Sequence, residues 1–95
     1  MSFILKNPFY TGIIIEKNKT IHYHKGLPHN NDGPAVIYEN GAKEWLCHGL
    51  LHRLDGPAVI KRNGIEWYLN GVYYGCNDEY NLESWSKIVN LQILK

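Results

Sequence analysis

The sequence lacks the features that define several protein classes. Its 95 residues include only two cysteines, so it is not a disulfide scaffold, and a reducing cytoplasm is the expected location. The formal net charge is +1, which argues against binding to long nucleic acid or to a membrane surface. No apolar run approaches the roughly 20 residues of a membrane-spanning helix, and the N-terminus lacks the apolar core of a signal peptide. We therefore expect one soluble domain over residues 1–95.

What the sequence does contain is an internal repeat. The string DGPAVI at residues 32–37 returns at residues 55–60, a shift of 23 positions. An Asn-Gly pair and a Glu-Trp pair follow each copy, and a weaker copy precedes them. These shifts predict three repeats, at about residues 7–29, 30–52 and 53–77.

Each repeat has the pattern of a β-hairpin. In the second repeat, residues 35–38 favour a strand, Asn40-Gly41 is typical of a type I′ turn, and residues 45–48 favour the return strand. The Asp-Gly-Pro string predicts a tight turn between hairpins. One hairpin is marginal in water, whereas stacked hairpins bury a continuous face. The expected fold is mainly β, an antiparallel meander of three tandem hairpin repeats. Each repeat is about 23 residues long, which is the shift at which the sequence resembles itself.

Alternation along the strands assigns side chains to two faces. Trp67 and Leu69 share one face, which we expect to be buried together with Trp45 and Cys47. The other face interleaves tyrosines with lysines and amides, typical of a surface that stacks on bases or of a protein interface. Cross-strand aromatic pairs that only stabilise the sheet are a third explanation. This second face comprises Tyr23, Lys25, Tyr38, Lys61, Tyr68, Asn70, Tyr73 and Tyr74.

The C-terminal residues change to helical spacing. Asn81 is a suitable N-cap, and apolar residues follow at helical intervals, which predicts one α-helix over about residues 81–94. We expect this helix to cap the last hairpin and cover the end of the sheet. The alternative is a helix that mediates oligomerisation or docks a partner, because its last turn is apolar on more than one side.

The motif Glu-Trp-x-x-His-Gly-x-x-His-x-x-Asp-Gly at residues 44–56 resembles the MORN repeat (membrane occupation and recognition nexus). It is most similar to a divergent MORN-type group found in small proteins of bacteriophages and large viruses, with distant relatives described as antitoxins. Tyr74 stands where this pattern has histidine, and the first copy lacks Asp-Gly-Pro. The resemblance implies a β-meander with a binding role, and it transfers no catalytic residue.

The His-Arg-x-Asp cluster is the first candidate for chemistry. His52 and Arg53 can donate hydrogen bonds to a phosphate or carboxylate, and Asp55 follows them. The alternative is that the cluster pins the turn between hairpins. Its recurrence around His29 and Asp32 favours this structural role, because such a role recurs with the fold.

Metal binding and catalysis are less favoured. His29, His48, His52 and Cys47 could supply zinc ligands, but alternation puts Cys47 and His48 on opposite faces, so we expect no metal and no cofactor. A nucleophile such as Cys47 or Ser84 would need a base held in a pocket, which three hairpins do not offer. We expect no catalytic residue; a small hydrolase is the third hypothesis.

The sequence therefore predicts a non-enzymatic protein that binds and sequesters a partner. By its resemblance, it is expected to be a phage-encoded inhibitor of host defence that captures a small nucleotide-type ligand. Because one subunit is too small for a deep pocket, we expect a homo-oligomer. The alternative is an inhibitor or scaffold that binds a host protein through the aromatic face or the C-terminal helix. The residues expected to hold the ligand are Arg53, His52, Tyr68, Asn70, Tyr38, Lys61, His29 and Tyr74.

Overall fold

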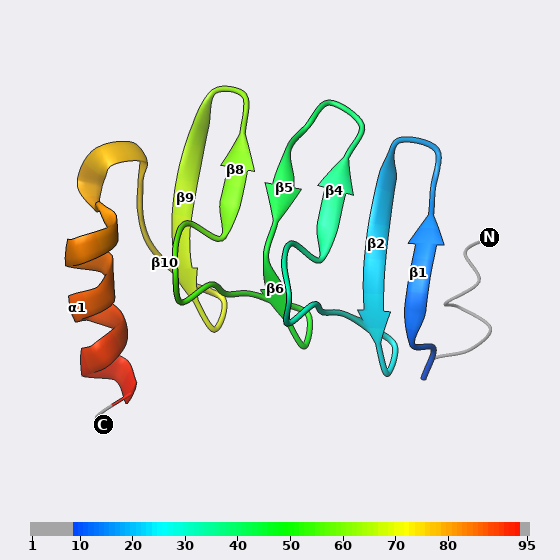
Figure 1. The fold of residues 1–95 in the computed structure, drawn as a ribbon, viewed down its shortest axis with the longest axis horizontal. Coiled ribbons are helices and arrows are strands. Elements are labelled where there is room, and N and C mark those ends of the chain that lie inside the picture. Colours follow the sequence, from blue (N-terminus) through cyan, green and yellow to red (C-terminus); the bar gives the residue numbers. More distant parts are fainter. Residues whose placement is uncertain (1–8, 94–95) are drawn as a thin grey trace.

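The computed structural model describes residues 9–93 as an antiparallel β-sheet followed by one C-terminal helix (Figure 1). Residues 7–8 and 94, at the expected ends of the first repeat and of the helix, lie outside the described residues. The molecule is a thin slab of 41 × 32 × 19 Å. The predicted fold class is thus confirmed at the level of a mainly antiparallel β protein with a C-terminal α-helix.

The main sheet contains β1 (Gly12–Ile15), β2 (Lys19–His24), β3 (Leu27–Pro28), β4 (Val36–Tyr38), β5 (Lys43–Glu44), β8 (Val59–Lys61), β9 (Gly64–Leu69) and β10 (Val72–Cys76). Its strand order is β1-β2-β4-β5-β8-β9-β10, with β3 paired to the end of β2. A small separate sheet pairs β6 (Leu46–Cys47) with β7 (Leu50–Leu51), and a 3₁₀ helix at Asn77–Glu79 precedes α1 (Leu82–Ile93). Neighbouring strands of this sheet run antiparallel, and short turns join β1 to β2, β4 to β5 and β8 to β9.

The chain turns at Asn40-Gly41 as expected, but the turns with the backbone angles of type I′ lie at the opposite end of the hairpins. Asn40-Gly41 is not a type I′ turn, because Gly41 has a positive φ of 93° and Asn40 does not. The closing pair is Tyr38 and Ala42, which leaves a three-residue loop in which the Asn40 side chain accepts the Ala42 amide. Two consecutive positive φ angles, as type I′ requires, occur instead at Lys25-Gly26, His48-Gly49 and Asn70-Gly71.

Two clusters of buried hydrophobic side chains lie within the described part of the chain. Ile21, Ala35 and Val36 are buried in the first, and Trp67 and Leu69 are buried in the second, as predicted for the last two. Trp45 and Cys47, predicted to be buried with them, are half-buried. The reason is that α1 packs on Trp67 and Leu69 at the end of the sheet and leaves the corresponding middle positions without a helix over them.

The helix α1 begins where the sequence predicts. The Asn81 side chain accepts the Ser84 amide at 2.8 Å, and the Ser84 hydroxyl accepts the Asn81 amide at 3.0 Å, a reciprocal cap. Trp85 and Val89 are buried against the last hairpin, so the expected cap over that hairpin is confirmed. Among the described residues, no helix has the length and hydropathy that crossing a membrane requires.

Candidate functional site

The structure distributes the predicted ligand-binding residues over four places. The first is a tyrosine–carboxylate face of the sheet, the second a cavity beside α1, the third the turn before β8, and the fourth a histidine cluster at the hairpin ends. The sheet face holds Tyr38, Lys61 and Tyr68, and the cavity holds His52, Asn70 and Tyr74. The turn before β8 holds Arg53, and the histidine cluster holds His29.

Tyr38, Lys61 and Tyr68 share one face, as predicted, but carboxylates accompany them. The Tyr38 hydroxyl donates to Glu44 at 3.3 Å and the Tyr68 hydroxyl donates to Glu66 at 3.1 Å. Burial, followed by these carboxylates, raises the pKa of both phenols. Lys61 forms an ion pair with Glu66 at 3.0 Å. The Lys61 charge is therefore matched by a carboxylate, which disfavours phosphate binding at Lys61.

Tyr74 does not lie on the face predicted for it. Tyr73 and Tyr74 are consecutive residues of β10, and successive side chains of a strand point to opposite faces, so the two rings do not share one face. Tyr73 pairs with Tyr68, whereas the Tyr74 ring packs edge-on against Trp85 of α1 at 5.6 Å between centroids.

His52, Asn70 and Tyr74 come together in a cavity of about 210 Å³ between the last hairpin and α1. His52 already has a structural contact there, since its Nδ1 accepts the Asn70 amide at 2.9 Å. Burial lowers the pKa of His52, which favours the neutral imidazole that this hydrogen bond requires. The cavity is smaller than the roughly 300 Å³ or more typical of sites for drug-sized ligands.

Arg53 holds the turn before β8. Its Nε donates to Asp55 at 3.0 Å and its Nη1 donates to the Pro57 carbonyl at 3.1 Å. The guanidinium lies over the Trp45 ring, with Cζ 3.8 Å from the centroid. Asn30 holds the preceding turn in the same way, by donating to the Pro34 carbonyl. These contacts favour the turn-pinning alternative for the His-Arg-x-Asp cluster.

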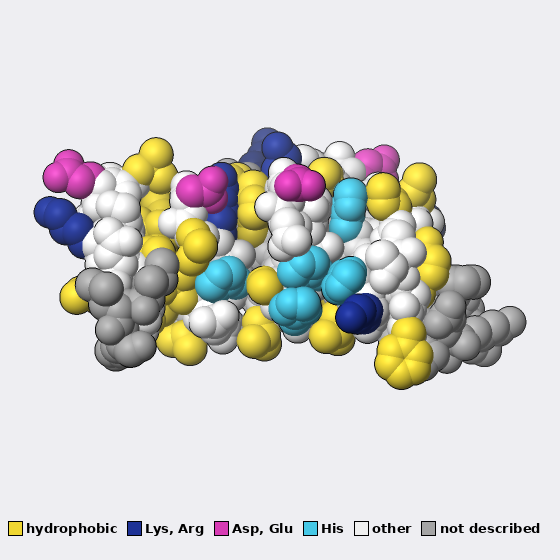
Figure 2. Space-filling view, turned by 60° about the horizontal axis from the view of Figure 1, so that its bottom comes forward, with side chains coloured by type: hydrophobic (Ala, Val, Ile, Leu, Met, Phe, Trp, Pro, Cys, Tyr) yellow, Lys and Arg dark blue, Asp and Glu magenta, His cyan; other side chains and the backbone are white. Residues whose placement is uncertain are grey.

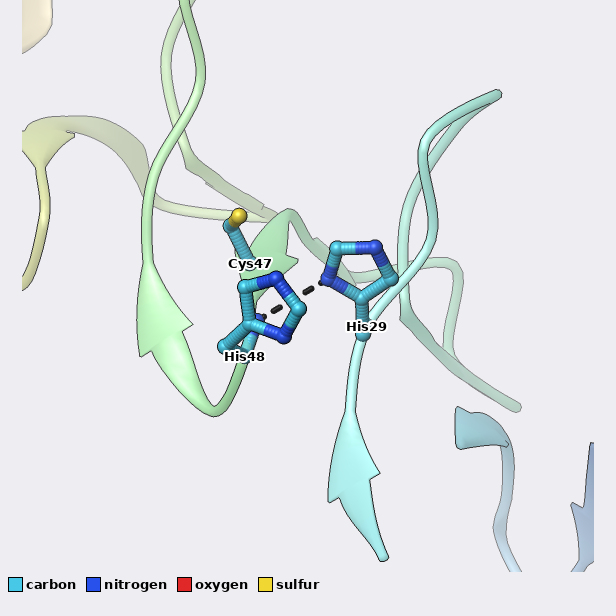
Figure 3. A group of neighbouring side chains, drawn as sticks. All are labelled: His29, Cys47 and His48. Carbon is cyan, nitrogen blue, oxygen red and sulfur yellow. Dashed lines mark hydrogen bonds between the residues drawn. The ribbon is translucent and has the colours of Figure 1, made fainter. Parts of the chain in front are cut away.

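A histidine cluster lies at the ends of the hairpins (Figure 3). His29 Nδ1 accepts the His48 amide at 3.0 Å, and the two rings stack with centroids 4.4 Å apart. The His24 ring lies 5.5 Å from that of His29. Burial and, next, the charge of His48 lower the pKa of His29. The ligand atoms of His29, Cys47 and His48 all lie within 4.8 Å of one another.

The expectation that Cys47 and His48 lie apart is therefore wrong. Alternation holds only for extended residues, and His48 occupies a turn with a φ of +50°. The turn brings the His48 ring and the Cys47 thiol to one side, where His29 from the preceding hairpin meets them.

An exposed row of aliphatic side chains was missed by the sequence analysis. Leu27, Leu50 and Val72 each follow the glycine of a tight turn, and they are 46%, 50% and 57% exposed. A Cβ placed on Gly49 would lie 3.5 Å from Leu27 Cδ2, and one on Gly71 would lie 3.3 Å from Leu50 Cδ2, so each leucine lies close to the glycine of the next turn along this edge. Figure 2 shows hydrophobic side chains along this edge, histidines directly above them, and acidic side chains at the opposite edge. The recurring Gly-Leu and Gly-Val pairs were the available signal.

No protein-family model, curated protein or solved structure matches this chain, so its function must be argued from the geometry above.

Proposed function

We propose that the protein is a non-enzymatic interaction module that binds a partner protein through the aliphatic row of Leu27, Leu50 and Val72. The observation that carries this proposal is the exposure of three aliphatic side chains at equivalent positions along one edge. Contiguous apolar surface rimmed by polar groups is typical of an interaction site. The three units that present the row are proposed to be tandem MORN-type hairpins, in keeping with the sequence repeat.

The spacing of the row favours a helical partner. Corresponding positions in successive hairpins are separated by two strand spacings, about 10 Å. Residues seven apart on an α-helix are also about 10 Å apart and lie nearly on one face. An extended peptide presents one face every second residue, at about 7 or 13 Å, and matches the row less well.

The residues beside the row indicate which polar side chains the partner carries next to its apolar residues. Lys25, His48 and Asn70 each precede the glycine of a tight turn, so hydrogen-bond donors border the aliphatic side chains. Acidic side chains on the face in Figure 2 lie along the far edge. The proposed partner is therefore an amphipathic helix with apolar residues seven apart and Asp or Glu beside them.

Selection from a random library of helix-forming peptides on the immobilised protein tests this proposal. Selected peptides should carry apolar residues at a spacing of seven and bind Leu50→Lys more weakly than the unchanged protein, by about tenfold or more, since one leucine is lost from the contact. Ile15→Lys is the matched control, because Ile15 is 80% exposed on β1 and outside the row. Circular dichroism checks the fold of both variants.

Peptides that bind Leu50→Lys as tightly as the unchanged protein would refute the proposed surface. So would selected peptides without the seven-residue apolar spacing, because the geometric argument requires it.

Capture of a small nucleotide-type ligand is the second candidate function. The observation in its favour is that the cavity beside α1 gathers three of the predicted ligand residues, His52, Asn70 and Tyr74. Its volume of about 210 Å³ holds part of a nucleotide, so this function requires a homo-oligomer that completes the site. For both candidate functions, the resemblance to small bacteriophage proteins supports a cytoplasmic inhibitor of host defence.

Native mass spectrometry with a panel of cyclic and linear nucleotides tests the second candidate. An oligomer that retains nucleotide at a fixed ratio supports this function. The variant to compare with the unchanged protein is His52→Asn, which keeps a hydrogen-bond acceptor for the Asn70 amide. A bare species across the panel refutes nucleotide capture and leaves the peptide selection as the decisive experiment.

A further inference from the structure

The turn at Cys47-His48 differs chemically from a turn with the same backbone. The His48 amide donates to His29 Nδ1 at 3.0 Å, and the Asn70 amide donates to His52 Nδ1 at 2.9 Å. Both turn residues have a φ of about 50° and precede a glycine. In the second turn, Leu69 and Asn70 stand in the places of Cys47 and His48, and the hydrogen bond still forms. The fold therefore does not require a thiol and an imidazole at Cys47 and His48.

From this departure and from the side-chain geometry, we propose that His29, Cys47 and His48 bind a zinc ion. Thiolate and imidazole are the ligands that Zn²⁺ prefers. With Zn–S and Zn–N bonds of about 2.3 and 2.0 Å, ligand atoms in a tetrahedral site lie roughly 3.5 Å apart. The three ligand atoms here already lie within 4.8 Å of one another, so side-chain rotations on the turn bring them into range.

The fourth position is open to His24 or to water. The His24 ring lies 5.5 Å from that of His29 and 6.2 Å from that of His48. His24 comes from the end of β2, so a metal with all four ligands would tie the first hairpin to the second. This role differs from the proposed function, in which His48 only borders the aliphatic row and His29 and Cys47 take no part.

Metal binding has a specific consequence for one backbone amide. A neutral imidazole has one nitrogen lone pair, and in His29 the Nδ1 lone pair accepts the His48 amide. A metal on Nδ1 takes that lone pair, and a metal on Nε2 moves the ring proton to Nδ1. Either way the hydrogen bond from His48 is lost. The equivalent bond between Asn70 and His52 is unaffected, and it serves as an internal reference.

Titration of the reduced protein with Co²⁺, a spectroscopic substitute for Zn²⁺, tests the proposal. One equivalent should bind and produce the near-ultraviolet charge-transfer band of a cobalt–thiolate bond. Competition with Zn²⁺ should then remove this band. Hydrogen exchange should become faster at the His48 amide in the zinc-loaded protein and stay unchanged at the Asn70 amide.

Two variants and one control assign the ligands. Cys47→Ser should abolish the charge-transfer band, and His48→Asn, which copies the turn at Asn70, should weaken Zn²⁺ binding at least tenfold. The control is Cys76→Ser, because Cys76 lies beside Glu79 and outside the cluster. It should bind Co²⁺ like the unchanged protein. Absence of the band in the unchanged protein, or its persistence in Cys47→Ser, would overturn the proposal.

Discussion

Trp85 should be the single most important side chain for attaching α1 to the sheet. It is 1% exposed, and its ring contacts Trp67, Tyr74 and Tyr80 with centroids 5.1, 5.6 and 5.4 Å away. Its Nε1 also donates to the Arg53 carbonyl at 3.1 Å, which links the helix to the turn before β8. Replacing Trp85 by alanine removes all of these contacts at once.

The expected cost follows from the size of the cavity and the hydrogen bond. Truncating a buried tryptophan to alanine costs about 3–5 kcal/mol, and a carbonyl left without a donor adds to the loss unless water reaches it. We expect Trp85→Ala to lower the unfolding free energy by about 4 kcal/mol. The total unfolding free energy of a domain of this size is roughly 5–14 kcal/mol. A loss of about 4 kcal/mol should lower its melting temperature by about 20 °C. Trp85→Phe keeps most of the apolar contact and should cost about 1–2 kcal/mol, mainly through the Arg53 carbonyl.

Urea unfolding followed by far-ultraviolet circular dichroism measures these differences. Leu82→Ala is the matched control, because Leu82 begins the same helix and is 66% exposed. It should change the unfolding free energy by less than about 0.5 kcal/mol. If Trp85→Ala costs no more than Leu82→Ala, then α1 does not pack on the last hairpin and the description of the second core cluster is wrong.

Two further predictions concern stability. Burial lowers the pKa of His52 from its ordinary value of 6.5, so the unfolded chain binds the proton more tightly and stability decreases as the pH falls below 6.5. His52→Asn keeps an acceptor for the Asn70 amide and should show a smaller loss of melting temperature between pH 7 and pH 5; an unchanged pH profile would contradict this origin. Ala58 is 0% exposed immediately before β8, so Ala58→Val should overpack the core and cost about 1–3 kcal/mol in urea unfolding. A stability equal to that of the unchanged protein would mean that the space around Ala58 is not closed.

The elements themselves could be predicted because their signals are local. Apolar alternation located β9 and the burial of Trp67 and Leu69, and the Asn81 cap with helical spacing located α1. Each of these patterns depends on a few adjacent residues, and the tertiary structure does not override them.

The turns and faces were harder because they depend on how strands pair. The turn at Asn40-Gly41 is closed by Tyr38 and Ala42, a pairing that the Asn-Gly signal does not determine. The side of Tyr74, by contrast, was available from the sequence, because Tyr74 follows Tyr73 directly on β10 and successive side chains of a strand point to opposite faces.

The candidate sites were missed for the same physical reason. Cys47 and His48 read as neighbours on one strand in the sequence, but the positive φ of His48 ends the strand between them. The aliphatic row depends on residues far apart in the sequence that approach each other, such as Leu27 and Gly49, which no local pattern contains. Neither feature follows from periodicity within one element.

Comparison between hairpins separates structural from functional roles more reliably than composition does. His29 and His52 accept the same backbone hydrogen bond, so that bond belongs to the fold. Cys47 and His48 stand where the last hairpin has Leu69 and Asn70, so their donor atoms are not needed for folding. Residues that depart from the recurring pattern while the backbone keeps it are therefore the ones to mutate first, and the proposed zinc ligands Cys47 and His48 meet this criterion.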